Sequence, residues 1–168
     1  IAYTLAALFP KAEILGCDIS DRALEIAQGQ QVYINGQKTI PLPQKPIFFK
    51  ADILEEPSAA GMYLEDMDFI FSNPPYVMES EKDTMDENVL GFEPHLALFV
   101  PDNDPLRFYR ALGKWAMELL VSSGEALFEI NEFLAKETAE LFESMGFSDV
   151  EIIEDFRDKK RFVHFTKW

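Results

Sequence analysis

Short apolar runs alternate with segments of helical periodicity along the chain, and this alternation constrains the fold more than any other feature of the sequence. The runs that are predicted to form strands cover residues 12–17, 46–51, 67–72 and 124–130. Two later runs, 150–153 and 162–166, are predicted to form a closing antiparallel pair. Strands that alternate with helices build a mostly parallel sheet, so we predict an α/β fold in which residues 1–168 form one domain.

Helices are predicted between these strands. One covers residues 1–9, and a second begins after Ser20, whose hydroxyl can cap the free amide groups of a first turn. The apolar positions of the second helix are Ala23, Ile26, Ala27, Tyr33 and Ile34. The apolar faces of two later helices are predicted to contain Tyr109, Leu112, Ala116, Met117 and Leu120, and then Leu134, Thr138, Leu141, Phe142 and Met145. Gly146 is predicted to stop the last of them.

Two segments lack such periodicity. Residues 36–46 contain three prolines and are predicted to be a loop with room for a short hairpin. Residues 77–104 show no clear period over a length that is unusual for a loop in a compact domain. Loops of this length are commonly functional.

Composition excludes several classes of protein. No apolar run approaches the ~20 residues that a membrane helix needs, and no basic segment followed by an apolar one opens the sequence, so neither a membrane protein nor a secreted one is predicted. Cys17 is the only cysteine, which suits a reducing cytoplasm. His95 and His164 lie far apart and no metal-ligand spacing occurs, so no metal site is predicted.

Charge narrows the choice of partners. The chain has 30 acidic residues and 15 basic ones, for a formal net charge of −15. Proteins that bind phosphates need a basic surface, so no direct nucleic-acid binding is predicted. Residues 79–87 hold five acids and one lysine. This segment is interpreted either as a solvated acidic loop or as a lip that attracts a basic partner.

The most specific motif is the tetrapeptide Asn-Pro-Pro-Tyr at residues 73–76, which directly follows the predicted strand 67–72. Alone, such a tetrapeptide can be only a turn, because proline and asparagine both favour chain reversal. Its position favours a binding site, because open parallel sheets bind ligands beyond the carboxyl ends of their strands. Asp18 and Asp52 follow two other predicted strands in the same way.

This ordered set resembles the amino-methyltransferases of the class I S-adenosylmethionine-dependent fold, in which Asn, Asp or Ser precedes Pro-Pro and then Tyr, Phe or Trp. The resemblance implies a Rossmann-like, doubly wound, mostly parallel sheet and S-adenosylmethionine as the cofactor. It implies that Asp18, with Ile19 beside it, binds the ribose hydroxyls of the cofactor. It also implies that Asp52 receives the adenine amino group while Ile53 packs on the ring. Each acid can instead be a local residue at the start of a helix.

The chemistry of these enzymes, which methylate a nitrogen conjugated to a planar system, explains the residue types. The lone pair of an amide nitrogen is delocalised, so acceptors on both N–H bonds would aim it at the methyl carbon. The side-chain oxygen of Asn73 and the carbonyl of Pro74 are the candidate acceptors, and Pro75 adds stiffness. Tyr76 can stack on the amide and face the sulfonium. Asn73, Pro74 and Tyr76 are therefore the candidate catalytic residues, all four residues line the substrate site, and Asn73 also borders the cofactor.

Beyond the motif, the sequence resembles the HemK-type release factor glutamine methyltransferases. Residues 91–99 look like that family's Phe-Glu-Pro block, and 104–112 look like its next helix. Glu129 matches an acid at the end of the fourth strand, and 161–163 match a closing arginine-hydrophobic pair. The resemblance implies methyl transfer to the side-chain amide nitrogen of a glutamine in a peptide-chain release factor, with that factor as the partner and the cytoplasm as the location.

One departure from the family concerns its first strand and a glycine-rich turn of the form D-x-G-x-G-x-G. In the family both precede the helix that corresponds to residues 1–9, and neither occurs in this sequence. The strand would be central in the sheet, between those that end at Asp18 and Ser72, and without it backbone groups lose their partners. We therefore expect the chain to be incomplete at its N-terminus, without the family's small helical domain.

Other classes of protein remain as alternatives. An N6-adenine methyltransferase of DNA or RNA also uses this motif and would flip a base into the same slot. The net charge of −15 and the absence of a target-recognition region argue against it. A non-catalytic fragment that retains the fold is a further alternative. A Rossmann dehydrogenase shares the acid after the second strand but gives no reason for the motif at 73–76.

The absent glycine-rich turn leads to a prediction for the 168-residue chain. We expect it to bind S-adenosylmethionine weakly or not at all, because the turn that lets backbone approach the methionyl part of the cofactor is missing. Isothermal titration calorimetry measures this affinity, and tight binding would contradict the expectation.

Overall fold

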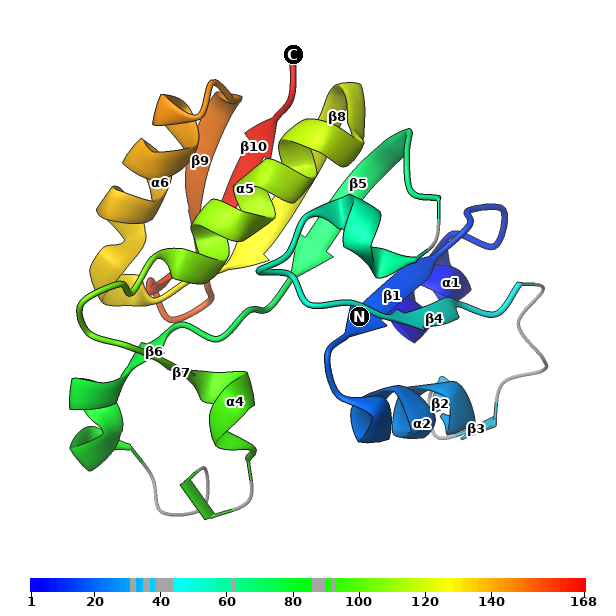
Figure 1. The fold of residues 1–168 in the computed structure, drawn as a ribbon, viewed down its shortest axis with the longest axis horizontal. Helices are drawn as coiled ribbons and strands as arrows, with labels where there is room; N and C mark the ends of the chain where they lie inside the picture. The colour runs from blue at the N-terminus through cyan, green and yellow to red at the C-terminus, as the bar shows by residue number, and fades with distance from the viewer. Residues whose placement is uncertain (31–32, 35–36, 39–43, 62, 86–89, 92) are drawn as a thin grey trace. The chain divides into compact units, whose positions relative to one another are not determined.

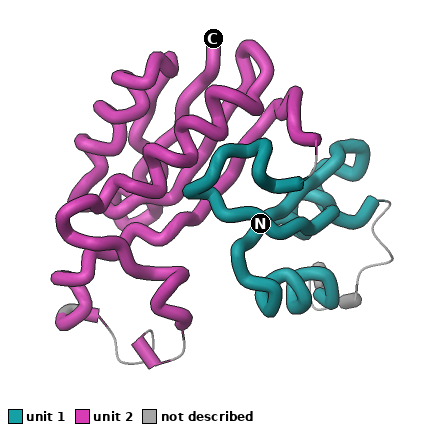
Figure 2. The backbone as a smooth tube through the Cα atoms, viewed as in Figure 1, with its two compact units in different colours: residues 1–62 teal, residues 63–168 magenta. Residues whose placement is uncertain are grey.

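The computed structural model describes residues 1–30, 33–34, 37–38, 44–61, 63–85, 90–91 and 93–168. The chain divides into two compact units, residues 1–62 and 63–168, which are described separately (Figure 2). None of the helices in the described part of the chain is both long enough and apolar enough to cross a membrane.

The first unit is built on a pair of parallel strands with helices around them (Figure 1). Strand β1 pairs with β4 in a register that places Asp18 opposite Lys50. A Cβ atom at Gly16 would lie 2.8 Å from the Phe48 ring, so only glycine permits this close approach. The elements are α1 (Ala2–Leu8), β1 (Leu15–Asp18), α2 (Asp21–Gly29), β2 (Tyr33–Ile34), β3 (Gln37–Lys38), β4 (Ile47–Lys50) and the 3₁₀ helix η1 (Pro57–Ala60).

The start of α2 was predicted correctly and its end was not. The Ser20 hydroxyl accepts a hydrogen bond from the amide of Ala23, which confirms the predicted N-cap. The helix ends at Gly29, and Tyr33–Ile34 forms an antiparallel pair with Gln37–Lys38 instead of continuing it. Glycine is a poor helix former, and tyrosine and isoleucine favour strands, so the apolar spacing alone was misleading.

The loop predicted at 36–46 corresponds only partly to the described residues. The hairpin suggested there begins earlier, at β2, and includes β3. Residues 36 and 39–43 lie outside the described part of the chain.

The second unit contains a four-stranded sheet in the order β5-β8-β10-β9. Strands β5 and β8 are parallel, whereas β10 is antiparallel to both β8 and β9, which confirms the predicted closing pair. The elements are β5 (Met67–Ser72), β6 (Val77–Met78), the 3₁₀ helix η2 (Glu79–Thr84), α4 (His95–Leu98), β7 (Phe99–Val100), α5 (Arg107–Leu119), β8 (Leu120–Glu129), the 3₁₀ helix η3 (Glu132–Leu134), α6 (Ala135–Ser144), β9 (Ser148–Glu154) and β10 (Lys160–Thr166).

Helices α5 and α6 pack against the sheet of the second unit (Figure 1). An aromatic cluster forms the core between them. The Phe142 ring of α6 lies with its centre 4.4 Å from that of Phe165 on β10 and 6.5 Å from that of Tyr109 on α5. Phe128 on β8 packs edge-on against Phe165. These four side chains are fully buried, so the cluster joins both helices to the central strands.

Two predictions in this unit were wrong in detail. Leu120 was placed on a helix, but it is the first residue of β8, since α5 ends at Leu119. Residues 77–104 were expected to lack secondary structure, yet they contain η2, α4 and a parallel pair in which Val77 lies opposite Phe99. Elements this short give no readable period, which explains the error. Residues 86–89 and 92 lie outside the described part of the chain.

Strands β1 and β5 are both edge strands among the described residues. Within the described residues, β1 pairs only with β4, and β5 pairs only with β8. Their second edges are the positions at which the family's additional strand was expected to pair.

Replacing Phe142 with alanine should reduce the stability of the second unit strongly. We expect Phe142→Ala to lower the free energy of unfolding by about 3–5 kcal/mol, because it removes a fully buried ring from the cluster. The matched control is Phe133→Ala, since Phe133 is 72% exposed and should change stability by no more than about 0.5 kcal/mol. Chemical denaturation followed by circular dichroism measures both, and equal losses would contradict the assignment of the core.

Candidate functional site

The motif at 73–76 leaves the sheet where two parallel strands end together. Ser72, the last residue of β5, lies opposite Phe128, so the motif emerges beside Glu129 at the end of β8. Within the motif, Asn73 is exposed and Pro74 is buried, while Pro75 and Tyr76 are half-buried. The Asn73 side chain is therefore accessible to a ligand, and the prolines are held against the protein.

Hydrogen bonds hold Tyr76 from two sides. Its hydroxyl donates to Oε1 of Glu129 over 2.6 Å, and its carbonyl oxygen accepts from Nδ2 of Asn131 over 3.1 Å. Burial of the phenol, followed by its hydrogen bond to Glu129, raises the pKa of Tyr76 to about 12. The ring therefore stays uncharged at neutral pH and fixed in orientation.

Tyr109 on α5 makes two hydrogen bonds at the end of β8. Its hydroxyl donates to the carbonyl oxygen of Glu129 over 3.2 Å and accepts from the amide of Asn131 over 3.3 Å. Burial raises the pKa of Tyr109, so the phenol is uncharged. The sequence pattern predicted Tyr109 only as part of an apolar helix face, and nothing in it singled out Asn131. The signal that could have found Asn131 is a polar residue directly after a buried strand.

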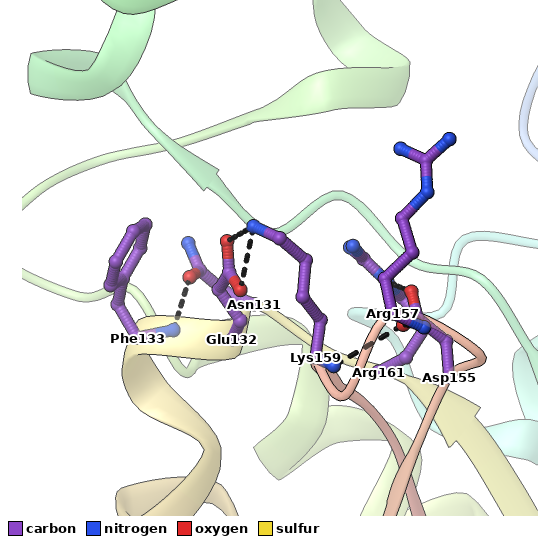
Figure 3. A network of polar contacts seen from close by, with 7 residues as sticks. All are labelled: Asn131, Glu132, Phe133, Asp155, Arg157, Lys159 and Arg161. Carbon is purple, nitrogen blue, oxygen red and sulfur yellow. Dashed lines mark hydrogen bonds and ion pairs between the residues drawn. The ribbon is translucent and has the colours of Figure 1, made fainter.

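A second polar network orders the turn between β9 and β10 (Figure 3). Oδ1 of Asp155 accepts from the amides of Arg157 and Lys159, and Oδ2 pairs with Arg161 at 3.4 Å. The hydrogen bond from the Arg157 amide is the main cause that lowers the pKa of Asp155. Nζ of Lys159 lies 2.7 Å from Glu132 of η3. These contacts fix Arg161, the first residue of the predicted arginine-hydrophobic pair, beside the end of β8.

Four of the residues predicted to bind the cofactor, Asp18, Ile19, Asp52 and Ile53, lie in the first unit, whereas the fifth, Asn73, lies in the second. Asp18 ends β1, and Asp52 follows the parallel strand β4 by two residues, so both lie at the carboxyl edge of the same strand pair. Oδ1 of Asp18 accepts from the Ser20 amide over 2.8 Å, and Oδ1 of Asp52 accepts from the Leu54 amide over 2.9 Å. The alternative local roles of these acids are therefore present.

The remaining atoms of these two acids still suit a ligand. Within the described part of the chain, Oδ2 of Asp18 and Oδ2 of Asp52 accept no hydrogen bond. Ile19 is exposed and Ile53 is half-buried. A carboxylate oxygen can accept from hydroxyls or from an amino group, and a nearby isoleucine can pack on a flat ring. That this edge and the motif at 73–76 form one site stays a prediction.

Comparison with known proteins identifies the fold class first. No family model matches the sequence. A methyltransferase from Pyrococcus furiosus superimposes with a TM-score of 0.60 at 17% identity, covering 98% of this chain and 68% of that one. A TehB-like SAM-dependent methyltransferase from Corynebacterium glutamicum gives a TM-score of 0.58 at 17% identity, with 100% and 74% covered. The chain therefore has the Rossmann-like fold of the class I methyltransferases, as predicted.

In sequence, the chain is similar to curated release factor glutamine methyltransferases. The chain is 40% identical over 163 residues to the release factor glutamine methyltransferase of Bacteroides thetaiotaomicron, covering 97% of this chain and 55% of that protein. It is 39% identical to that of Flavobacterium psychrophilum, covering 97% and 53%. Over nearly its whole length the chain is therefore similar to release factor glutamine methyltransferases. It spans about half the length of these curated relatives.

Removing the Tyr76 hydroxyl should show how much its bond to Glu129 stabilises the second unit. We expect Tyr76→Phe to lower the free energy of unfolding by about 1–3 kcal/mol at neutral pH, because a charged acceptor loses its donor. The folded-state pKa of about 12 lies above the ordinary tyrosine pKa of 10.0, so this contribution is complete below pH 10 and is lost as the pH rises through 12.

Thermal unfolding of both proteins across this alkaline range measures the effect, and tyrosinate absorbance reports the titration. The difference in melting temperature between them should shrink as the pH rises. A difference that stays constant through this range would contradict the assignment.

Proposed function

We propose that the natural gene product that carries these 168 residues transfers a methyl group from S-adenosylmethionine to the side-chain amide nitrogen of a glutamine in a peptide-chain release factor. In this proposal residues 1–168 are parts of one catalytic domain, and the enzyme meets its partner in the cytoplasm. The proposal is supported by 40% identity to a release factor glutamine methyltransferase over 97% of the chain. The single structural observation that carries it is the exposed Asn73 beside a buried Pro74 and a Tyr76 fixed at both its hydroxyl and its carbonyl.

The residues of the motif have separate roles in binding the amide. Asn73 accepts one N–H bond of the glutamine carboxamide through its side-chain oxygen, and the Pro74 carbonyl accepts the other. Pro75 limits the freedom of the backbone that carries this carbonyl. Tyr76 provides a flat, uncharged surface for the amide plane. Two acceptors on the nitrogen align its lone pair, and such alignment is a recognised source of rate enhancement.

The cofactor supplies an electrophilic methyl group on a sulfonium. Asp18 is proposed to accept from its ribose hydroxyls, with Ile19 beside it. Asp52 is proposed to accept from the adenine amino group, while Ile53 packs on the ring. The free Oδ2 atoms of the two acids support these roles, because each carboxylate uses only Oδ1 in its local turn. Asn73 borders both ligands.

No general base is required among these residues. The amide nitrogen can lose its proton after the methyl group is attached, because the methylated intermediate is a strong acid. Oε1 of Glu129 accepts from the Tyr76 hydroxyl, so the role proposed for Glu129 is to hold the ring. Catalysis in this proposal is alignment of the amide together with exclusion of water.

The alternative of a nucleic-acid methyltransferase is less well supported. A formal net charge of −15 opposes binding to a polyanion, and the acidic η2 segment follows directly after the motif. A protein partner with a basic surface avoids this repulsion.

Asn73→Ala tests the proposal in the natural gene product. We expect transfer of labelled methyl groups to a release factor to fall by at least about 100-fold, since one of the two acceptors that align the amide is lost. The matched control is Asn103→Ala, because Asn103 is an exposed turn residue outside the motif. Circular dichroism should show both variants folded.

The same methyl-transfer assay with oligonucleotides as substrates distinguishes a protein methyltransferase from a nucleic-acid methyltransferase. Neither single-stranded DNA nor RNA should accept label from the wild-type protein. Retained transfer in Asn73→Ala would contradict the role of Asn73, and label on an oligonucleotide in place of the release factor would support the alternative.

A further inference from the structure

Asn131 is one of the few polar side chains buried in the described part of the chain, with 4% of its surface exposed. It follows directly after β8 and Ile130, at the edge of the sheet where the motif emerges. The proposed chemistry assigns it no role, although it donates to the carbonyl oxygen of Tyr76. A buried carboxamide is costly unless its hydrogen bonds are made, so its partners indicate its role.

All the hydrogen-bonding groups of this carboxamide have partners. Nδ2 donates to the carbonyl oxygen of Tyr76 over 3.1 Å and to Oε2 of Glu81 over 2.9 Å. Oδ1 accepts from the amide of Phe133 over 2.9 Å, which caps η3 (Figure 3). The same Oε2 of Glu81 accepts from the amide of Met78 over 2.8 Å. Asn131 therefore joins the end of the motif to the acidic helix η2.

The bond to Tyr76 matters because of the prolines before it. Neither Pro74 nor Pro75 has an amide hydrogen, so the backbone between Asn73 and Tyr76 cannot be fixed by its own donors. Its position is set at one end by the pairing of β5 with β8 and at the other by the carbonyl of Tyr76. Between that carbonyl and the carbonyl of Pro74 lies Pro75, whose ring fixes φ, so a shift of the first carbonyl is expected to move the second.

We propose that Asn131 is a positioning residue of the amide site: its Nδ2 holds the Tyr76 carbonyl and thereby sets the orientation of the Pro74 carbonyl that accepts from the substrate. The inference rests on the proposed function, since it deepens the account of the same site. Glu81 holds the second Nδ2 hydrogen and so keeps the carboxamide in the rotamer that reaches Tyr76.

Asn131→Asp separates this role from the cap of η3. Aspartate has the same shape and keeps an oxygen that accepts from the Phe133 amide, but it has no hydrogen to donate when ionised. The new carboxylate then faces the Tyr76 carbonyl and the Glu81 carboxylate, and both contacts become repulsive. Other ionisable groups near it are the hydroxyls of Tyr76 and Tyr109, Glu129 at the end of β8, Glu132 of η3, and Arg161 and Lys159 on the β9–β10 side.

Steady-state kinetics of the natural gene product with a release factor test the proposal. At neutral pH we expect kcat for Asn131→Asp to fall by about tenfold or more, with KM for the release factor changed by less than about threefold, because alignment and not binding is disturbed. The ratio of variant to wild-type kcat should rise as the pH falls, because a protonated carboxyl regains one donor and the neighbouring Glu81 raises its pKa. Asn103→Asp is the matched control for the added charge, and it should behave as the wild type.

The double variant Asn131→Asp with Glu81→Gln identifies the contact that matters. The glutamine amide can donate to the new carboxylate, which removes the repulsion and restores the link to η2. It cannot supply a donor to the Tyr76 carbonyl. We therefore expect thermal stability to recover while kcat stays low, with Glu81→Gln alone as the reference for the double-mutant cycle.

Two kinetic outcomes would overturn the inference: wild-type kcat in Asn131→Asp, or recovery of kcat together with stability in the double variant. If the wild-type protein methylates no release factor, the proposed function fails, and the positioning role is then decided by carbonyl ¹³C resonances. The resonances of both Tyr76 and Pro74 should shift in Asn131→Asp, and an unchanged Pro74 resonance would overturn the inference.

Discussion

Two parallel strands that end at the same edge of a sheet bring their following residues together, and the second unit depends on this property of β5 and β8. Ser72 pairs with Phe128, so the motif after β5 and the residues after β8 leave the sheet side by side. Both hydrogen bonds of Tyr76 reach residues just beyond that pairing, Glu129 and Asn131. A shift of one residue in the register would turn Glu129 to the opposite face of the sheet and break the contact with the phenol.

The aromatic core of the second unit stabilises this register of β5 with β8. Phe128 is buried on the same strand that carries Glu129, and it packs in the aromatic cluster with Phe142 and Phe165. Tyr109 belongs to both regions, because its ring packs in the cluster and its hydroxyl bonds to the end of β8. Tyr109 therefore connects the packed core to the residues of the candidate site.

The sequence predicted the parts of this arrangement that depend on local pattern. Apolar runs and the residues after them located the strands and the acids Asp18 and Asp52, and the motif at 73–76 needed no tertiary information. The contacts that complete the site were not predictable in this way, because Asn131 and Tyr76 are 55 residues apart and Asn131 and Tyr109 are 22 apart. The error at Tyr33 has a related cause, since an apolar spacing can continue by chance past the glycine that ends the helix.

Under the proposed function, the hydrogen bond between Tyr76 and Glu129 affects whether the phenol itself can be methylated by the sulfonium donor. Such methyl groups alkylate phenolates, and a phenolate beside a bound donor would compete with the intended acceptor. Tyr76 keeps its proton until about pH 12, and that proton is engaged by Glu129. A phenol that keeps its proton is a weaker nucleophile than a phenolate. Under the proposed function, the pKa that keeps this phenol protonated would also limit its alkylation by the methyl donor.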